Sequence, residues 1–323
     1  MAVGVAETRT WDALLTTTLA NYSEKLRDQI FDEYPILSWF NGKLAGALKR
    51  EKLLKTVAGG ESIVEHLLYE MNSTVKSYSG FETLDLTAQE GMTIGRFSWR
   101  QYAGGVSISG IEKRNNKGDK AMINLLEAKT TQCENSMRDR MSRDCYGANA
   151  DGKSLDGLGT ILSTTATLGG LSPTTFTWWQ PTSTASGSFA AQGLKDMRTL
   201  FNTLSFGNVT PDGLFTTQAI FEFFETSLQP QERYSNIDAA NTGFTNLTFK
   251  GKPIFFDRDC TSGQVVMLNS RAIKFCVHED ANMEMTKFVQ PNDQDAWSAK
   301  YIWQGNLVVN ERRKHGRLTA VTA

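Results

Sequence analysis

The stretch from Gly59 to Gly147 constrains the fold of this chain more than any other part of it. It joins a strand-rich segment, which has few residues able to form a core of its own, to a long and mostly polar predicted helix. Residues Ser62–Glu70 are expected to pair with Thr93–Tyr102, on either side of a polar tip at Asn72–Gln89. A two-stranded ribbon is at best marginally stable alone in water, so another surface must cover it. A second copy of the same chain is one candidate for that surface.

The predicted helix runs from Asp119 to Tyr146 and would form a rod about 40 Å long. Asp119 is a favourable N-cap residue, and Gly147 is expected to end the helix. Charged side chains cover most of its surface, so a single narrow stripe is expected to pack while the rest meets solvent or a polar neighbour. The stripe consists of apolar residues at helical spacing: Met122, Leu126, Cys133, Met137 and Met141.

The segments on either side of this stretch predict short elements. Before it, Trp11 to Phe40 reads as short helices interrupted by Pro35, an apolar arm whose hydrophobic residues must dock on a surface elsewhere. Between the ribbon and the helix, a further strand is expected from Val106 to Ile111, after Gly104.

After the helix, Asp151 to about Gly193 is rich in Gly, Ser and Thr. Short strands and helices separated by glycine turns then predict a compact α+β unit. The last segment, Trp297 to Val321, is strand-like and ends in a basic run. The expected helices are Leu194–Leu204 and Thr217–Leu228, and the expected strands are Leu247–Phe249, Pro253–Phe256, Val265–Asn269 and Ile273–His278.

Composition excludes several classes of protein. The 323 residues carry 34 basic and 35 acidic side chains, so no global field marks a nucleic-acid or membrane binder. No signal peptide and no apolar run long enough to span a bilayer is visible, and we expect a soluble protein made in a cytoplasm. No pair of the four cysteines, Cys133, Cys145, Cys260 and Cys276, forms a C-x-x-C motif. Reduced, buried thiols are therefore expected.

The candidate chemical motifs are weak. Cys276 and His278 fall on one face of a predicted strand and could pair a thiol with a base, but no motif places an orienting Asn or Asp. Ser107 follows Gly105, yet Ser109 occupies the second glycine position of a nucleophile elbow. We therefore predict no catalytic site, no cofactor and no metal, and a hydrolase using Cys276 or Ser107 is the least favoured alternative.

Two further patterns have simple structural explanations. Gly157-Leu-Gly159 resembles the start of a dinucleotide loop but has Leu162 where the third glycine should stand, so a turn after the helix is expected. The acidic pairs Glu279-Asp280 and Asp293/Asp295 could bind a cation, but solvated loop charges are far commoner.

The basic run near the end of the chain contains Arg312, Arg313 and Arg317. It could contact nucleic acid. Salt bridges to a neighbouring chain, for example to Asp139 or Asp144 on the long helix, are at least as well supported.

The order of these pieces resembles a known family. An apolar arm, an extended ribbon, a long helix, a Gly/Ser/Thr-rich α+β unit and a returning terminal strand together resemble the major capsid proteins of tailed double-stranded DNA bacteriophages, which have the Hong Kong 97-type fold. The stretch Leu247-Thr-Phe-Lys-Gly-Lys-Pro-Ile-Phe-Phe-Asp257 is similar to the family's strand–Gly–strand passage. The ending from Asn306 to Thr319 is similar to its closing peripheral strand.

The resemblance implies an α+β fold with four parts. These are an N-terminal arm (1–56), an extended β-ribbon loop (57–104), a peripheral domain (105–150 with 281–323) containing a spine helix at 119–146, and an axial domain (151–280). The function implied is self-assembly into the hexamers and pentamers of an icosahedral shell around double-stranded phage DNA.

The resemblance also implies contacts between subunits. In the extended loop they would involve Lys76, Tyr78, Phe81, Leu84 and Leu86, and in the peripheral domain Arg138, Asp139, Asp144, Arg312, Arg313 and Arg317. Some relatives cross-link through a loop lysine, for which Lys76 is a candidate by position only.

The partners implied are further copies of the chain, a portal, a decoration protein, non-specific contact with packaged DNA and no membrane. No long, charged helical region precedes Trp11, so a separate scaffolding protein is expected. The location implied is the virion, with assembly in the host bacterial cytoplasm. An encapsulin-like compartment that holds an enzyme is the alternative within the same fold.

Overall fold

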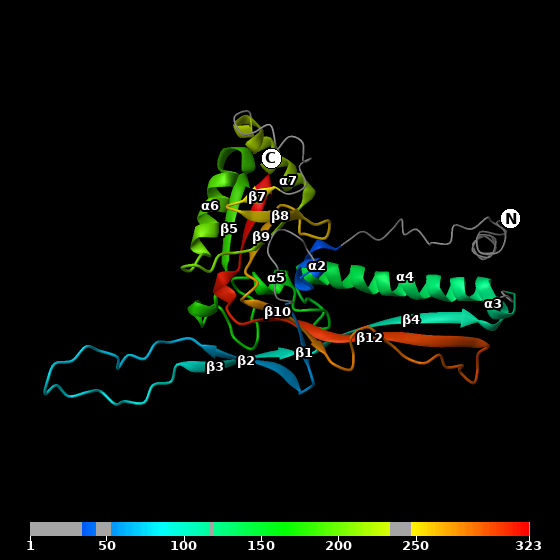
Figure 1. Cartoon of the computed structure of the whole chain (residues 1–323). Helices are drawn as coiled ribbons and strands as arrows, with labels where there is room; N and C mark the ends of the chain where they lie inside the picture. Colours follow the sequence, from blue (N-terminus) through cyan, green and yellow to red (C-terminus); the bar gives the residue numbers. More distant parts are fainter. Residues whose placement is uncertain (1–33, 43–52, 116–118, 233–246, 323) are drawn as a thin grey trace. The chain divides into compact units, whose positions relative to one another are not determined.

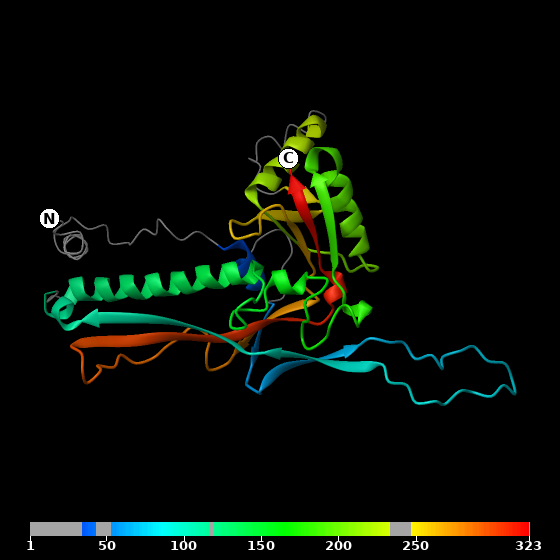
Figure 2. The same cartoon turned by 180° about the vertical axis from the view of Figure 1, so that it is seen from behind.

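The computed structural model describes the backbone of residues 34–42, 53–115, 119–232 and 247–322, and their side chains outside 115–124 and 228–232. The described chain divides into two compact units. The helix unit comprises Gln101–Met141 and Asp280–Gln304. The sheet unit comprises the described parts of Tyr34–Arg100, Ser142–Glu279 and Gly305–Ala323. Figures 1 and 2 show the elements from opposite sides.

The long helix α4 is the main element of the helix unit and runs from Asp119 to Tyr146, as predicted. Of the predicted stripe, Met137 and Met141 are buried and Cys133 is half-buried. The backbone N–H of Gly147 donates to the carbonyl of Arg143 (3.1 Å), which completes the last turn. Helix α4 and strand β12 (Ala296–Val309) each contribute residues to both units.

Strand β4 (Arg100–Ser109) is longer than predicted and runs through both Gly104 and Gly105. A Cβ atom at Gly104 would lie 2.5 Å from the Cys133 Sγ and 3.0 Å from the Met137 Sδ. This glycine therefore allows strand and helix to approach closely, whereas the sequence predicted a strand start after it. β4 pairs with β12, and the short β11 (Glu284–Met285) pairs antiparallel with β12.

Ile111 was predicted in a strand but lies in helix α3 (Gly110–Asn115). The helix begins with a capping box. The backbone N–H of Ser109 donates to Glu112 Oε2 (3.0 Å), and the backbone N–H of Glu112 lies 3.2 Å from Ser109 Oγ, which accepts. These two reciprocal bonds satisfy donors that open a helix, which explains why the strand ends here.

The ribbon at the base of the predicted extended loop forms from β2 (Ser62–Leu68) and β3 (Met92–Ser98), which pair antiparallel with Ile63 opposite Phe97. The predicted pairing is confirmed up to Ser98. Beyond it the prediction was wrong, because residues from Arg100 onward form β4. Phe97 is buried beside Gly169, so this part of the ribbon is covered by its own unit.

The sheet unit contains a six-stranded sheet in the order β5-β13-β9-β6-β8-β7. β5 pairs parallel with β13, and β6 parallel with β8; the other pairs are antiparallel. The strands are β5 (Thr182–Ser188), β6 (Gly213–Thr216), β7 (Thr248–Phe249), β8 (Lys252–Phe256), β9 (Val265–Leu268) and β13 (Gly316–Thr322). A second ladder in this unit pairs β1 (Leu54–Val57) with β10 (Ile273–His278), and β10 with the last residues of β12.

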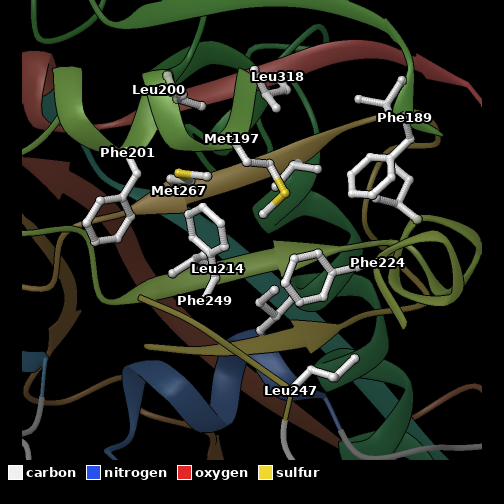
Figure 3. Packing of buried hydrophobic residues seen from close by; sticks show 14 of the residues in the cluster. Phe189, Met197, Leu200, Phe201, Leu214, Phe224, Leu247, Phe249, Met267 and Leu318 are labelled. Carbon is white, nitrogen blue, oxygen red and sulfur yellow. The ribbon is translucent and has the colours of Figure 1, made fainter. Parts of the chain in front are cut away.

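Two helices, α6 (Leu194–Thr203) and α7 (Gln218–Glu232), pack against the six-stranded sheet. Figure 3 shows Met197, Leu200 and Phe201 of α6 and Phe224 of α7 gathered with side chains of the strands. Leu214 of β6 is completely buried there. The cluster also includes Phe189, Leu204, Ile220, Leu247, Phe249, Ile254, Val265, Met267, Leu318 and Val321.

The root of the predicted N-terminal arm docks within the sheet unit. In helix α2 (Pro35–Phe40) Ile36, Trp39 and Phe40 are buried. The Trp39 ring lies edge-on to Phe215, with centroids 5.7 Å apart, and Phe40 stacks on Phe275 at 5.4 Å. Docking of the arm is thus confirmed for these residues, and Trp11 to Glu33 lie outside the described residues.

A buried carboxylate holds this root in place. Asp257 Oδ2 accepts hydrogen bonds from the backbone N–H of Ile36 (3.4 Å) and from the Tyr146 hydroxyl (2.9 Å). Burial raises the pKa of the Asp257 carboxyl above its ordinary value, against the effect of these bonds.

The strand-like ending consists of three elements. β12 ends at Val309, the 3₁₀-helix η3 covers Arg312–Lys314, and β13 follows. β13 pairs with β5 and β9, so residues 316–322 belong to the sheet of the region predicted as the axial domain. The sequence had predicted that residues 316–322 belong to the peripheral domain with the long helix. Their strand partners β5 and β9 lie far away in the sequence, so only tertiary packing decides this pairing.

The remaining predicted elements α6, α7, β7, β8, β9 and β10 are present, with ends shifted by a few residues or fewer. Strands β1, β5, β6 and β11 were not predicted. The short helical turns α5 (Leu158–Ile161), η1 (Thr177–Trp179) and η2 (Phe189–Gly193) complete the described elements. Among the described residues, no helix is both long and apolar enough to cross a membrane.

Candidate subunit-contact surfaces

Residues 69–91, here called the extended loop, continue the β2–β3 ribbon without forming a strand. Figure 1 shows the loop leaving β2 and returning to β3. Its large apolar side chains are exposed: the exposed fraction is 109% for Phe81, 91% for Met71 and 91% for Leu86. Burying one such side chain contributes about 1.5–3 kcal/mol, so the loop offers several unmade contacts.

All five loop residues predicted to contact another subunit are exposed. They are Lys76, Tyr78, Phe81, Leu84 and Leu86. Each of these five side chains is therefore accessible to a partner molecule. Their contacts with another subunit remain predictions.

The tip of the loop has local order. The backbone N–H of Glu82 donates to the carbonyl of Ser79 (3.2 Å), which closes a turn that includes Gly80 at φ +53°. Lys76 Nζ donates to the carbonyl of Thr83 (2.9 Å) across the same turn. Phe81 is therefore presented at the apex of a closed turn.

An aromatic contact anchors the base of the loop, and the sequence did not indicate it. The Tyr69 ring stacks on Trp178 of η1, with centroids 5.4 Å apart and planes at 16°. The Tyr69 hydroxyl donates to the carbonyl of Glu90 (3.0 Å), and its backbone N–H donates to that of Gly91 (2.9 Å). Two adjacent tryptophans in a Gly/Ser/Thr-rich stretch were the available signal.

The basic run does not form one positive patch. Arg312 is completely buried, and its guanidinium donates to the carbonyls of Thr160 (2.8 Å), Ile161 (2.7 Å), Ser163 (2.6 Å) and Ala166 (3.0 Å). Burial lowers its pKa to about 10, so the group stays charged at neutral pH. This placement accounts for the side chain within its own chain and leaves it no exposed surface for the predicted contact with another subunit.

The other two arginines of the run lie nearer the surface. Arg313 is exposed, and its guanidinium carbon lies 5.1 Å from the centroid of Phe206. Arg317 is half-buried in β13, where its Nε donates to Ser183 Oγ (3.2 Å). Burial lowers the pKa of Arg317 somewhat.

The predicted contact residues of α4 differ in accessibility. Arg138 is about half exposed and lies 3.8 Å from Glu134, a spacing that stabilises a helix only slightly. Asp139 is almost fully buried, which leaves little carboxylate surface for a neighbouring chain. Asp144 is half-buried. The proposed ion pairs from α4 to Arg313 or Arg317 of another copy remain predictions.

The candidate nucleophiles are not activated. Cys276 is completely buried, and burial raises its pKa to about 11, which disfavours the thiolate that a nucleophile requires. His278 packs against Trp99, with ring centroids 5.4 Å apart. The Ser107 hydroxyl is exposed, and its carbonyl accepts a bond from Lys129 Nζ (3.2 Å).

The cysteines agree with the prediction of free thiols. Cys145, Cys260 and Cys276 are buried and Cys133 is half-buried, and none forms a disulfide. Burial raises the pKa of Cys260 to about 12 and that of Cys145 further.

Asp295 of the acidic pairs and Gly159 of the glycine-rich motif make structural contacts. Asp295 accepts a hydrogen bond from Arg114 (2.6 Å) through its carboxylate and from the Gly110 N–H (2.7 Å) through its carbonyl. Gly159 donates to the carbonyl of Gly147 (3.1 Å), where the chain turns against the end of α4. Within the described ranges, no group of three or more His, Cys, Asp or Glu side chains is arranged to hold a metal ion.

No family model and no curated protein sequence matches the chain. Solved structures match its fold over nearly its whole length. A subunit of the Cyanophage A-1(L) capsid is 14% identical with a TM-score of 0.62, and the match covers 96% of this chain and 99% of that one. The SrpI encapsulin of Synechococcus elongatus PCC 7942 is 11% identical with a TM-score of 0.60, and the match covers 99% and 96%.

A third match is the capsid of Myoviridae Phage XM1, at 13% identity and a TM-score of 0.54, covering 98% of this chain and 99% of that one. At such low identities the comparison concerns the fold. The predicted fold class is confirmed: the chain has the α+β fold of the Hong Kong 97 type that these capsid and encapsulin subunits share.

Proposed function

We propose that this chain is a major capsid protein that self-assembles into the hexamers and pentamers of an icosahedral shell around double-stranded phage DNA. The observation that carries the proposal is the match to capsid subunits from end to end, at 96% coverage of this chain and 99% of the cyanophage subunit. A match to an isolated motif would not account for the loop, the long helix and the sheet together.

The exposed apolar side chains of the extended loop support this function. A soluble monomer gains nothing by presenting Phe81, Leu86 and Met71 to water, whereas an assembled shell can bury them. Obligate interfaces commonly bury about 2,000–5,000 Å², and a long loop laid on a neighbouring copy is an efficient way to supply such an area.

The remaining parts of the proposal concern partners and location. A net charge of −1 suits dense packing of copies and avoids tight trapping of the enclosed DNA, since affinity grows with each phosphate that is neutralised. A portal, a separate scaffolding protein and a decoration protein are the proposed protein partners. The proposed location is the virion, after assembly in the host bacterial cytoplasm, and the proposed role is structural rather than catalytic.

Electron microscopy of the purified protein tests the proposal. Closed shells tens of nanometres across, alone or with a co-expressed scaffold, are the expected result. A monodisperse monomer or dimer under all of these conditions would contradict it.

The structural match to an encapsulin gives a second candidate, a protein compartment around an enzyme. The contents and the genes separate the two candidates. Nuclease-resistant DNA in native particles, with terminase and portal genes nearby, indicates a capsid. A co-purifying enzyme encoded next to this chain indicates a compartment.

A further inference from the structure

The helix unit contains a small apolar pocket, here called the Trp297 pocket, with a volume of about 200 Å³. Its apolar lining consists of Ile108, Leu125, Leu126, Phe288 and Trp297. All five side chains are half-buried rather than fully buried, so the pocket faces solvent. An apolar cavity of about 150 Å³ can hold benzene, and the Trp297 pocket is therefore large enough for a phenyl ring.

We propose that Phe81 at the tip of the extended loop of one copy inserts into the Trp297 pocket of a neighbouring copy. The inference rests on the proposed function and specifies one contact that would hold the shell together. Phe81 is the fully exposed aromatic residue of a closed turn, and a turn that is already formed loses less conformational entropy on docking than a disordered tip.

The length of the loop limits where such a contact can form. The arm from Tyr69 to Phe81 can reach at most about 40 Å from its anchor on Trp178. The pocket of the neighbouring copy must therefore lie within that distance of the anchor.

The charges of loop and pocket are complementary. Residues 69–91 carry the acidic side chains of Glu70, Glu82, Asp85 and Glu90 against one basic residue, Lys76. Beside the pocket, Glu112 pairs with Lys129 (3.0 Å) and Asp295 with Arg114 (2.6 Å).

One further lysine adds positive charge at the pocket. Lys113 lines it, and its Nζ lies 3.6 Å from the centroid of Trp297. Glu82, next to Phe81, can approach Lys113 when the phenyl ring enters.

Disulfide trapping between two singly substituted chains tests the contact. Phe81→Cys chains and Phe288→Cys chains are mixed before assembly and then oxidised. We expect at least ten-fold more covalent dimer on a non-reducing gel than from either variant alone or from Leu86→Cys with Phe288→Cys. The single variants measure the background from the native cysteines.

Assembly yields give an independent readout. Phe81→Ser should reduce the yield of closed shells at least ten-fold, and Leu126→Trp, which fills the pocket, should do the same. Combining the two should cause no further loss, because both remove one contact. Leu86→Ser is the matched loop control and should reduce the yield less.

Several outcomes would overturn the proposal. One is dimer formation no greater than in the controls, and another is a wild-type yield of shells from Phe81→Ser. A disulfide between positions 81 and 288 that forms only within one doubly substituted chain would place the contact inside the subunit. A cross-link from Phe288→Cys to Leu15→Cys in place of Phe81→Cys would assign the pocket to the N-terminal arm.

The two proposals fail differently. Cross-linking is measured on whatever oligomer the wild type forms. Absence of closed shells contradicts the proposed function, and absence of the cross-link contradicts this contact.

Discussion

The six-stranded sheet and the extended loop use the same kinds of side chain in opposite ways. Around the sheet, Leu214 and Met267 are completely buried between strands and helices of their own chain. In the loop, Leu86 and Phe81 are exposed. The sheet region completes its own core, whereas the loop has apolar side chains that the described part of the chain leaves exposed. Subunit stability and assembly should therefore depend on different residues.

Shortening the loop is the strongest test of this separation. Replacing Asn72–Gln89 by a short glycine-rich turn should abolish closed shells, because the contacts of the loop are lost. It should change the free energy of unfolding of the subunit by less than about 1 kcal/mol, because those residues pack on little of their own chain. Electron microscopy and denaturant unfolding measure the two effects. Normal shells from the shortened chain would show that the loop was misinterpreted.

A matched pair of leucines sharpens the comparison. Leu214→Ala should lower the free energy of unfolding by about 2–5 kcal/mol, since it leaves a cavity in the core. Leu86→Ala should lower it by less than about 0.5 kcal/mol, since that side chain is solvated. Urea unfolding of the unassembled subunit measures both values, and similar losses would contradict the division.

Acid should weaken the sheet region through His315. This side chain is fully buried, and its Nδ1 accepts a hydrogen bond from the backbone N–H of Asn269 (3.2 Å). Burial lowers its pKa from 6.5 to about 4. Below pH 6.5 His315 is protonated in the unfolded chain but stays neutral in the folded chain. The free energy of unfolding therefore falls as the pH drops toward 4 and then levels off. The loss amounts to about 3 kcal/mol.

The control is His315→Asn, which keeps an acceptor for Asn269 but does not titrate in this range. Plotted against pH between 7 and 4, the difference in stability between wild type and variant should change by about 3 kcal/mol. A constant difference would show that His315 does not cause the acid sensitivity.

The smallest expected effect lies at the junction of the two regions. Tyr69→Leu removes the stack on Trp178 and the bond to Glu90, and should weaken the anchor of the loop by about 0.5–1.5 kcal/mol. Hydrogen exchange of the Tyr69 amide, which bonds to Gly91, should accelerate by up to about ten-fold. Tyr78→Leu at the tip is the matched control. Unchanged exchange in Tyr69→Leu would mean that the ribbon alone fixes the base.

Much of the helix unit could be predicted because its signals are local. Helix α4 has the predicted ends, where Asp119 begins a periodic segment and Gly147 follows it. The small number of core-forming residues between Asn72 and Gln89 likewise predicted a loop that packs little on its own chain. Strands β5 and β6 were missed because neither shows an alternating pattern. Thr182–Ser188 is built from small and mostly polar residues, and Gly213–Thr216 is buried on both faces.

The sequence predicted some features of the candidate contact surfaces and missed others. The exposed loop residues follow from composition, but the Tyr69–Trp178 stack joins positions 109 residues apart and has no local signature. The basic run looked like a surface patch because charged residues are rarely buried. Arg312 departs from that rule because four backbone carbonyls accept from its guanidinium.

The sequence by itself determined the long helix, the exposed loop and the order of elements typical of a Hong Kong 97-type subunit, because helical periodicity, caps and lack of core residues act within a few positions of the chain. Only the tertiary structure decided that β13 lies between β5 and β9, that Arg312 and His315 are buried, and that Asp257 holds the root of the arm. Each of these depends on groups far apart in sequence. These contacts stabilise the chain only after folding has brought the partner groups together and excluded water from them.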